Sequence, residues 1–93
     1  MIRSFGDREA EGIAQRKRSR KLPPDIHRVA ERKLRMLNAV VSLNELRVPP
    51  GNHLERLVGD WAGFYSIRIN DQWRICFRWR DGDAYDVQIR DYH

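Results

Sequence analysis

The feature that most constrains the fold is a regular alternation of side-chain type over residues 73–80. The odd positions hold aromatic and aliphatic residues, namely Trp73, Ile75, Phe77 and Trp79. The even positions hold Arg74, Cys76, Arg78 and Arg80. Because strand side chains alternate between two faces, this predicts a strand with one apolar and one cationic face. Asp81-Gly82 then suits a two-residue type I′ turn into a second strand, with Tyr85, Val87 and Ile89 sharing one side.

The remaining segments predict two helices and further strands around this hairpin. Asp7 suits the N-cap of a helix that runs through Ala14, and Pro24 or Asp25 opens a second helix. The second helix has an apolar stripe of Ile26, Val29, Ala30, Leu34, Leu37 and Val41. Its other faces carry His27, Arg28, Glu31, Arg32, Lys33 and Arg35. With strands expected over 2–5, 53–58 and 64–70, the fold class is α+β. We expect an N-terminal strand and two to three helices packed on a mainly antiparallel sheet of four to five strands.

Length, cysteine content and charge limit the classes of function. The chain has 93 residues, which we interpret as one domain spanning 1–93. A single cysteine, Cys76, excludes an internal disulfide and fits a reducing compartment such as the cytoplasm. No apolar run approaches the ~20 residues that cross a bilayer, so no membrane partner is expected. The net charge of +5 comes from the N-terminal half, and it serves solubility or favours a nucleic acid partner.

One short segment concentrates much of this charge. Five of its six residues are basic: Arg16, Lys17, Arg18, Arg20 and Lys21. Such a run repels itself and is usually a solvated loop. The alternatives are an arm that contacts the RNA backbone and a docking segment for an acidic partner.

Several kinds of active site are not indicated. His27, His53 and His93 are far apart in the sequence and form no metal-binding pattern, so no metal site is expected. The chain has no glycine-rich phosphate-binding motif, so no nucleotide cofactor is expected. Cys76 lies in the middle of a predicted strand, where we expect it to be packed rather than reactive.

What remains is an acid–base group spread over the predicted strands. It consists of Glu55, Arg74 and the closing Asp91, Tyr92 and His93. Cleavage of RNA needs a base for the 2′-hydroxyl, a cation for the pentacovalent phosphate and an acid for the 5′-oxygen. A carboxylate, a guanidinium and an imidazole meet these needs in turn. The residues alone favour a face that binds RNA without cleaving it over a catalytic site.

The C-terminal half also resembles a known family. Its motifs are Asn52-His53-Leu54-Glu55-Arg56-Leu57-Val58-Gly59-Asp60, Gly63-Phe64-Tyr65-Ser66-Ile67-Arg68-Ile69-Asn70, Trp73-Arg74-Ile75, Gly82-Asp83-Ala84-Tyr85 and Asp91-Tyr92-His93. These are similar to the HigB toxins of the RelE/ParE superfamily, from bacterial type II toxin–antitoxin systems. The resemblance implies a RelE-like fold and a ribosome-dependent endoribonuclease that cuts mRNA in the ribosomal A site. It also implies neutralisation by a HigA-type helix-turn-helix antitoxin, through which operator DNA is contacted only indirectly.

The resemblance assigns roles to individual residues. Asp91, Tyr92 and His93 match the C-terminal active-site residues, and Arg74 matches a phosphate-contacting arginine. Glu55 takes the position of the base, with His53 as the alternative. Lys and Arg are common in relatives where this chain has Val58 and Trp61, so we expect either that Arg56 or Arg78 compensates or that the activity is weak. Trp61 is expected to stack on a base or to cap a turn.

The full set of predicted RNA-binding residues comprises His53, Arg56, Trp61, Arg68, Arg78, Arg16, Lys17, Arg18, Arg20 and Lys21. We expect Arg74→Ala to abolish activity with only a modest change in stability. Two other hypotheses stay open: a non-catalytic module that binds RNA or the ribosome, and a ParE-like toxin acting on DNA gyrase.

Overall fold

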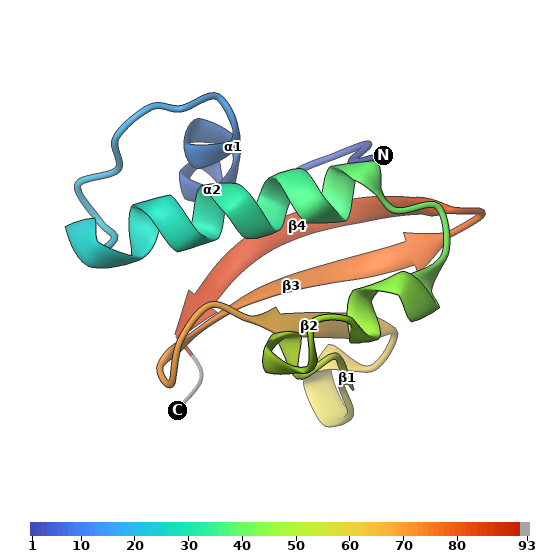
Figure 1. Ribbon diagram of the computed structural model, residues 1–93. Coiled ribbons are helices and arrows are strands. Elements are labelled where there is room, and N and C mark those ends of the chain that lie inside the picture. The colour runs from blue at the N-terminus through green and yellow to red at the C-terminus, as the bar shows by residue number, and fades with distance from the viewer. Residues whose placement is uncertain (92–93) are drawn as a thin grey trace.

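Four antiparallel strands form the centre of the fold, in the spatial order β1-β2-β3-β4 (Figure 1). The computed structural model describes residues 1–91. In that range the strands are β1 (Glu55–Arg56), β2 (Phe64–Arg68), β3 (Trp73–Arg80) and β4 (Asp83–Asp91). The α-helices are α1 (Arg8–Ala14) and α2 (Pro24–Ala39). Three short 3-10 helices follow in the chain: η1 (Leu43–Arg47), η2 (Pro50–Asn52) and η3 (Gly59–Trp61). The α+β architecture expected from the sequence is confirmed.

The β3–β4 hairpin forms as the alternation predicts. Asp81 and Gly82 have φ values of 51° and 83°, as a type I′ turn requires, and Arg80 pairs with Asp83 across it. Ile75 and Phe77 are fully buried in the core beneath α2. The sheet therefore has one face covered by helices and a second face that carries the arginines.

A β-bulge in β4 reverses part of the predicted pattern. Asp86 has a φ of 53°, and the register shifts between the Cys76 and Arg78 pairs. Tyr85 pairs with Arg78, so its side chain lies on the arginine-bearing face, opposite to that of Val87. The prediction that Tyr85 shares a side with Val87 and Ile89 is wrong, because the extra residue changes the alternation.

Helix α2 packs its predicted stripe against the sheet, with two corrections. Ile26, Ala30, Leu34 and Leu37 are all buried. Val41 is 77% exposed, because the helix ends at Ala39 before reaching it. Lys33, placed on an exposed face by the sequence pattern, is buried, with 7% of its surface accessible.

Helix α1 begins where the sequence predicts. The Asp7 carboxylate accepts a hydrogen bond from the backbone N–H of Ala10 at 2.7 Å, which caps the helix. Its second oxygen accepts from the backbone N–H of Ile89 at 3.1 Å. One side chain thus both starts α1 and attaches it to β4.

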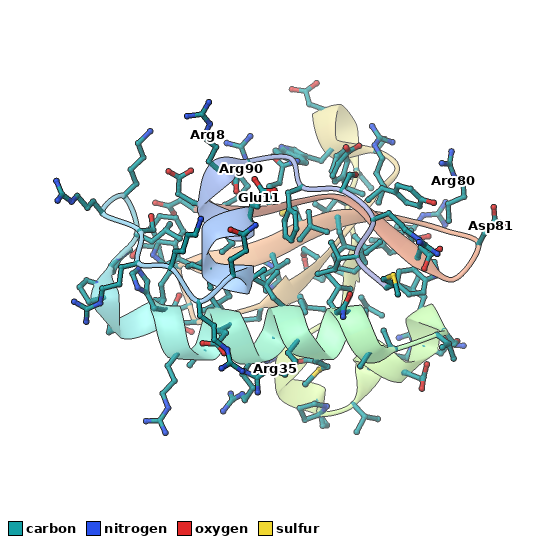
Figure 2. The ribbon with its side chains drawn as sticks, turned by 90° about the horizontal axis from the view of Figure 1, so that it is seen from above. Arg8, Glu11, Arg35, Arg80, Asp81 and Arg90 are labelled. Carbon is teal, nitrogen blue, oxygen red and sulfur yellow. The ribbon has the colours of Figure 1, made fainter. Side chains whose placement is uncertain are left out.

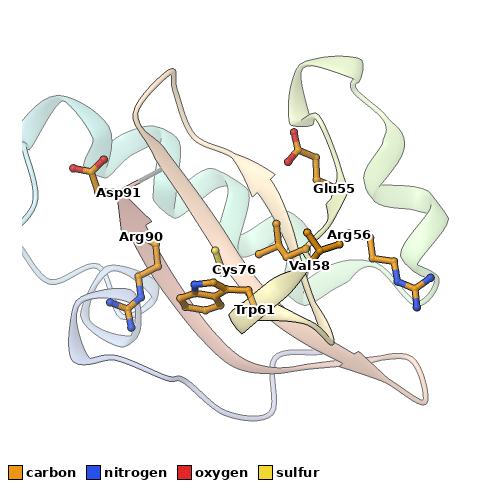
Figure 3. A pocket seen from close by; sticks show the side chains of 8 residues that line it. Glu55, Arg56, Val58, Trp61, Cys76, Arg90 and Asp91 are labelled. Carbon is orange, nitrogen blue, oxygen red and sulfur yellow. The ribbon is translucent and has the colours of Figure 1, made fainter. Parts of the chain in front are cut away.

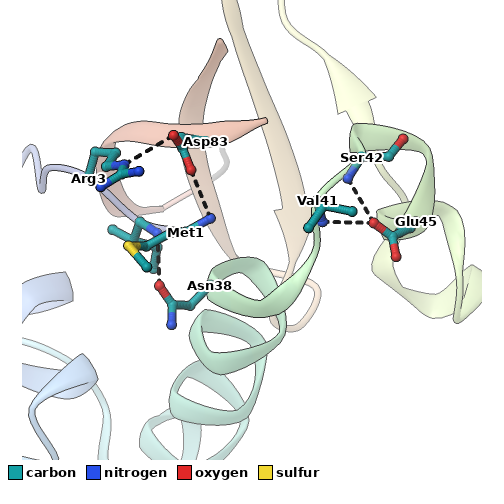
Figure 4. Close-up of polar contacts among 8 residues, drawn as sticks. Met1, Arg3, Asn38, Val41, Ser42, Glu45 and Asp83 are labelled. Atoms are coloured by element: carbon teal, nitrogen blue, oxygen red, sulfur yellow. Dashed lines mark hydrogen bonds and ion pairs between the residues drawn. The ribbon is translucent and has the colours of Figure 1, made fainter. Parts of the chain in front are cut away.

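The N-terminal segment lies along β4 without forming a full strand, so the predicted strand over 2–5 is wrong. Only two isolated parallel bridges form, from Ile2 to Ala84 and from Phe5 to Val87. The β4 bulge lies between them and interrupts a continuous ladder. The N-terminal ammonium and the Arg3 guanidinium both bond to Asp83, at 3.1 and 3.0 Å (Figure 4). These contacts fix the start of the chain to the hairpin.

No helix within residues 1–91 has the length and apolar character needed to cross a membrane.

Candidate active site

Five arginines gather on the sheet face that the helices leave uncovered. This arginine face consists of Arg68, Arg74, Arg78, Arg80 and Arg90. Arg74 pairs directly with Arg68 on β2 and with Arg90 on β4. Like charges placed opposite one another in a sheet are destabilising. A fold that retains such a row is suited to an anionic ligand.

Arg74 is buried at the centre of this row, and its side chain is only 6% exposed. Its Nε donates to Ser66 Oγ at 2.8 Å, and its Nη2 donates to the carbonyl of His53 at 2.5 Å. Arg74 therefore fixes the entry to β1 as well as carrying charge. The expectation of a modest stability change on Arg74→Ala is inconsistent with this environment.

Glu55 lies beside Arg74, as the proposed acid–base group requires. The Oε1 atom of Glu55 is 3.8 Å from Nη1 of Arg74, and the Glu55 side chain is 45% exposed. Both residues line a hollow of about 240 Å³, which we call the Glu55 hollow. Its other lining residues are His53, Arg68, Asn70 and Asp71. The two predicted residues on β1 and β3 are thus brought together.

His53 reaches the same hollow by a different backbone path from the one predicted. The expected strand over 53–58 is reduced to Glu55 and Arg56, because His53 has a left-handed conformation with φ of 43°. Its carbonyl is directed to Arg74 and not to a neighbouring strand. His53 therefore shares the hollow with Glu55, but not through the regular alternation of a strand.

A second concavity, of about 550 Å³, adjoins the Glu55 hollow (Figure 3). We call it the Trp61 pocket, and its lining residues are Glu55, Arg56, Leu57, Val58, Trp61, Cys76, Arg90 and Asp91. Glu55 lines both concavities, so the two are neighbours on the arginine face. In Figure 3 the Arg56 guanidinium points away from Arg90 and Asp91, which makes Arg56 a poor replacement for a missing cation in this pocket.

Arg90 is a pocket residue that the sequence analysis missed. Its guanidinium carbon lies 5.4 Å from the centre of the Trp61 ring, and its Nε donates to Gln88 Oε1 at 3.0 Å. The signal was present in the alternation of β4, because a residue next to Ile89 must lie on the opposite face. Trp61 also packs edge-on against Phe64, with ring centres 4.9 Å apart.

Arg68 and Arg78, both predicted to bind RNA, form ion pairs with acidic residues. Arg68 forms an ion pair with Asp71 and stays 34% exposed. Arg78 is 3.4 Å from Asp86, and its guanidinium lies over the Phe64 ring at 4.4 Å. Both remain on the arginine face and are accessible to a ligand that competes for these exposed pairs.

Of the three closing residues, the structure describes one. Asp91 ends β4 at the rim of the Trp61 pocket, where it accepts a hydrogen bond from Gln72 Nε2 at 2.9 Å. Tyr92 and His93 lie outside the described residues, so their assignment to the site remains a prediction.

Two buried titratable groups lie near the site. Cys76 is packed, as predicted, and burial raises the pKa of its thiol to about 11, which disfavours the reactive thiolate. Burial, followed by the nearby Arg32, Arg68 and Arg74 charges, lowers the pKa of Lys33. Lys33 donates to Asn52 Oδ1, and the buried Asn52 donates in turn to the carbonyl of Leu46 at 3.1 Å.

The basic segment 16–21 connects α1 to α2, on the helical side of the sheet (Figure 1). Its basic residues are all exposed, which fits the predicted solvated loop. Arg16 is 3.4 Å from Glu31, and Lys21 is 4.0 Å from Glu9. The basic segment does not line either concavity on the arginine face.

Within residues 1–91 there is no cluster of three or more His, Cys, Asp or Glu side chains suited to a metal ion.

The fold is shared with solved bacterial structures. A mutant of YafQ from E. coli superposes with a TM-score of 0.63 at 13% identity, covering 98% of this chain and 93% of that one. The YoeB-YefM complex from Staphylococcus aureus matches with a TM-score of 0.62 at 18% identity, covering 100% and 98%. At such identities the likeness defines the fold class, a RelE-like α+β domain.

Sequence comparison then gives the family. Residues 4–93 match the family described as RelE-like toxin of type II toxin-antitoxin system HigB. Toxin HigB-1 of Vibrio cholerae is 42% identical over 73 residues, which is 78% of this chain and 77% of the relative. Endoribonuclease HigB of Proteus vulgaris is 31% identical over 94 residues, covering all of both chains. The chain belongs to the HigB-like toxin family, and the resemblance seen in its motifs is confirmed. As a member of a toxin–antitoxin family, it has an antitoxin as its partner.

Proposed function

We propose that this toxin is an mRNA endoribonuclease that acts on translating ribosomes in the cytoplasm. The observation that carries the proposal is the Glu55–Arg74 pair, 3.8 Å apart over a hollow on the arginine face. The relative from Proteus vulgaris is named an endoribonuclease, which supports the same activity here. A carboxylate beside a guanidinium row is suited to a phosphodiester, because it offers a base next to charge stabilisation for the phosphate.

The proposed reaction uses side chains of this chain as acid and base. Glu55 takes the proton of the 2′-hydroxyl, and the 2′-oxygen forms a bond to phosphorus. The bond from phosphorus to the 5′-oxygen then breaks, leaving a 2′,3′-cyclic phosphate. His93 gives its proton to the departing 5′-oxygen. His53, in the same hollow as Glu55, is the alternative base.

The contacts of Arg74 indicate that the arginines of this face have different roles. Its Nε and Nη2 donate to Ser66 and His53, and its Nη1 lies 3.8 Å from Oε1 of Glu55. We assign Arg74 the tasks of positioning the 53–55 segment and supplying charge. More of Arg68 and Arg90 is exposed, and these residues are placed to contact phosphate oxygens directly.

Arg90 lies close to position 61, one of the two positions, 58 and 61, where the resemblance implies a cation. Val58, which is 82% exposed, is aliphatic and Trp61 is aromatic, so neither side chain supplies a positive charge. The Arg90 guanidinium lies against the Trp61 ring within the same pocket. We infer that Arg90 supplies the missing cation, in place of Arg56 or Arg78.

Mapping of mRNA 5′ ends after toxin expression tests the activity. Wild type is compared with Glu55→Gln and with a charge-matched control, Glu11→Gln, whose exposed carboxylate lies on α1 (Figure 2). We expect site-specific cuts with wild type and Glu11→Gln, and a loss of at least about 100-fold in Glu55→Gln, as for removal of a general base. His93→Gln should lose cleavage in the same way.

Other outcomes identify the competing functions. Growth arrest without cuts, unchanged in Glu55→Gln and His93→Gln, favours a non-catalytic RNA or ribosome binder, which the arginine face would also suit. Markers of DNA damage favour a gyrase-directed toxin. Cuts that persist in Glu55→Gln but vanish in His53→Gln assign the base to His53.

We also propose that the antitoxin is a HigA-type helix-turn-helix protein, and that the toxin meets operator DNA only through it. Family membership supports an antitoxin partner. Gel-shift measurements on the operator with toxin alone and with the complex test this. Specific binding by toxin alone contradicts it.

A further inference from the structure

The arginine face extends well beyond the two concavities, towards the turn of the β3–β4 hairpin. Arg80 is six residues beyond Arg74 on β3, which places it about 20 Å further along the strand. In Figure 2, Arg80 and Asp81 project at the tip of the hairpin, away from the helices. Nothing in the acid–base group requires a cation at this distance.

Guanidinium groups lie against aromatic rings along this route. Starting at the Trp61 pocket, Arg90 lies against Trp61, and Trp61 contacts Phe64. The guanidinium carbon of Arg78 lies 4.4 Å from the centre of the Phe64 ring. The last pair is Arg80 over Tyr85, with 4.7 Å between the guanidinium carbon and the ring centre.

Two backbone features build this arrangement. The Asp86 bulge places Tyr85 on the arginine face, opposite Arg78. Gly63 has a φ of 92°, which strains any other residue, and a Cβ there would lie 3.0 Å from Arg78 Nη1, so the guanidinium would have to shift slightly. A third concavity of about 240 Å³, which we call the hairpin hollow, lies beside this arrangement. Its lining residues are Gly63, Arg78, Trp79, Arg80 and Tyr85.

Single-stranded RNA is the ligand whose chemistry fits this row. Its phosphates bind arginine, and its unpaired bases stack on aromatic rings without a need for a particular sequence. In a duplex the base faces are covered, so these rings would have no partner. A length of about 20 Å spans several nucleotides, since even fully stacked ones occupy about 3.4 Å each, so the route is longer than a single scissile phosphate requires.

We propose that RNA bound at the Glu55 hollow continues along the arginine face to the hairpin hollow, where Arg80 contacts a phosphate and Tyr85 stacks on a base. This extended RNA site rests on the proposed function, because it places the scissile phosphate at Glu55. It assigns Arg80 and Tyr85 to RNA binding and not to the chemical step.

Fluorescence anisotropy with labelled 2′-O-methyl oligouridines tests the proposal, since these strands lack the attacking hydroxyl. Oligomers of about four and about twelve nucleotides are compared, bracketing the length of the route. With wild type, the longer strand should bind more tightly than the shorter one. We expect Arg80→Gln and Tyr85→Leu each to weaken binding of the longer strand by roughly tenfold and to remove most of this advantage.

The control is Arg35→Gln, which removes the same charge from an exposed position on α2 (Figure 2). It should retain the length advantage. Arg80→Gln should also lower the slope of log affinity against log salt by about 0.7, as expected for one lost contact to single-stranded phosphate. Thermal melts of Tyr85→Leu establish that the variant is folded, and the exposed Arg80 provides the independent test.

Retention of the length advantage in folded Arg80→Gln and Tyr85→Leu would overturn the proposal. So would an equal loss in Arg35→Gln, because binding would then follow net charge alone, or equal affinity for a duplex of the same length. Cleavage mapping with Glu55→Gln is a separate measurement. Absence of cleavage in all variants refutes the nuclease activity, whereas an absent length advantage refutes the extended RNA site.

Discussion

Replacing Arg74 by alanine should strongly destabilise the protein as well as disabling it. The mutation removes a side chain that is 6% exposed and that donates to Ser66 Oγ and to the His53 carbonyl. Hydrogen bonds that involve a charged group contribute about 1.5–3 kcal/mol each, so two of them give a loss of about 3–6 kcal/mol. Domains of this size have a total stability of about 5–15 kcal/mol. The melting temperature should therefore fall by roughly 15–30 °C.

Urea titration followed by circular dichroism measures this loss, with Glu55→Gln as the comparison. Glu55 faces the same guanidinium from a half-exposed position, and such a pair contributes about 0–1 kcal/mol. Arg74→Lys keeps the charge but has one nitrogen for two acceptors, so we expect an intermediate loss. A stability of Arg74→Ala within about 1 kcal/mol of wild type refutes the reasoning, because Ser66 and His53 would then not depend on Arg74.

Three further predictions concern other parts of the fold. Hydrogen bonds from Arg3 and the N-terminal ammonium lower the pKa of Asp83, so its contribution is present at neutral pH and lost as pH falls through the folded-state pKa. The difference in melting temperature between wild type and Asp83→Asn should accordingly shrink in acid, and a constant difference contradicts this. Asn52→Ala should cost about 2–4 kcal/mol in urea titrations, since Lys33 and the Leu46 carbonyl lose a buried partner. Cys76, with its pKa raised to about 11, should react with a thiol reagent at mildly alkaline pH only after denaturation, and rapid native labelling is the contrary result.

Much of the candidate site follows from local sequence pattern, and some does not. The alternation over 73–80 placed Arg74 and Arg78 on one face, and the structure agrees. Glu55 was placed near Arg74 by its position in the family motif, and the two lie 3.8 Å apart. The alternation of β4 also places Arg90 on the arginine face, but the family motif covers only the three residues after it. The assignments of Tyr92 and His93 stay predictions.

Three of the errors share a cause, because each depends on contacts between residues distant in the chain. Helical periodicity put Lys33 at the surface, but the 50–52 turn covers it and supplies Asn52 as its partner. His53 leaves the strand pattern where its carbonyl turns to Arg74, 21 positions away. Tyr85 changes face because β4 bulges where the N-terminal segment bonds to it through Ser4.

The sequence by itself determined the elements whose side-chain period is local: the β3–β4 hairpin with its Asp81-Gly82 turn, the two helices, and the family. Periodicity reports which face a residue takes as long as an element stays regular. Only the tertiary structure decided that the Arg74 guanidinium is buried against backbone acceptors, and that a bulge extends the arginine face with an aromatic ring. Both depend on hydrogen bonds between segments that meet only when the chain is folded, and no local pattern encodes them.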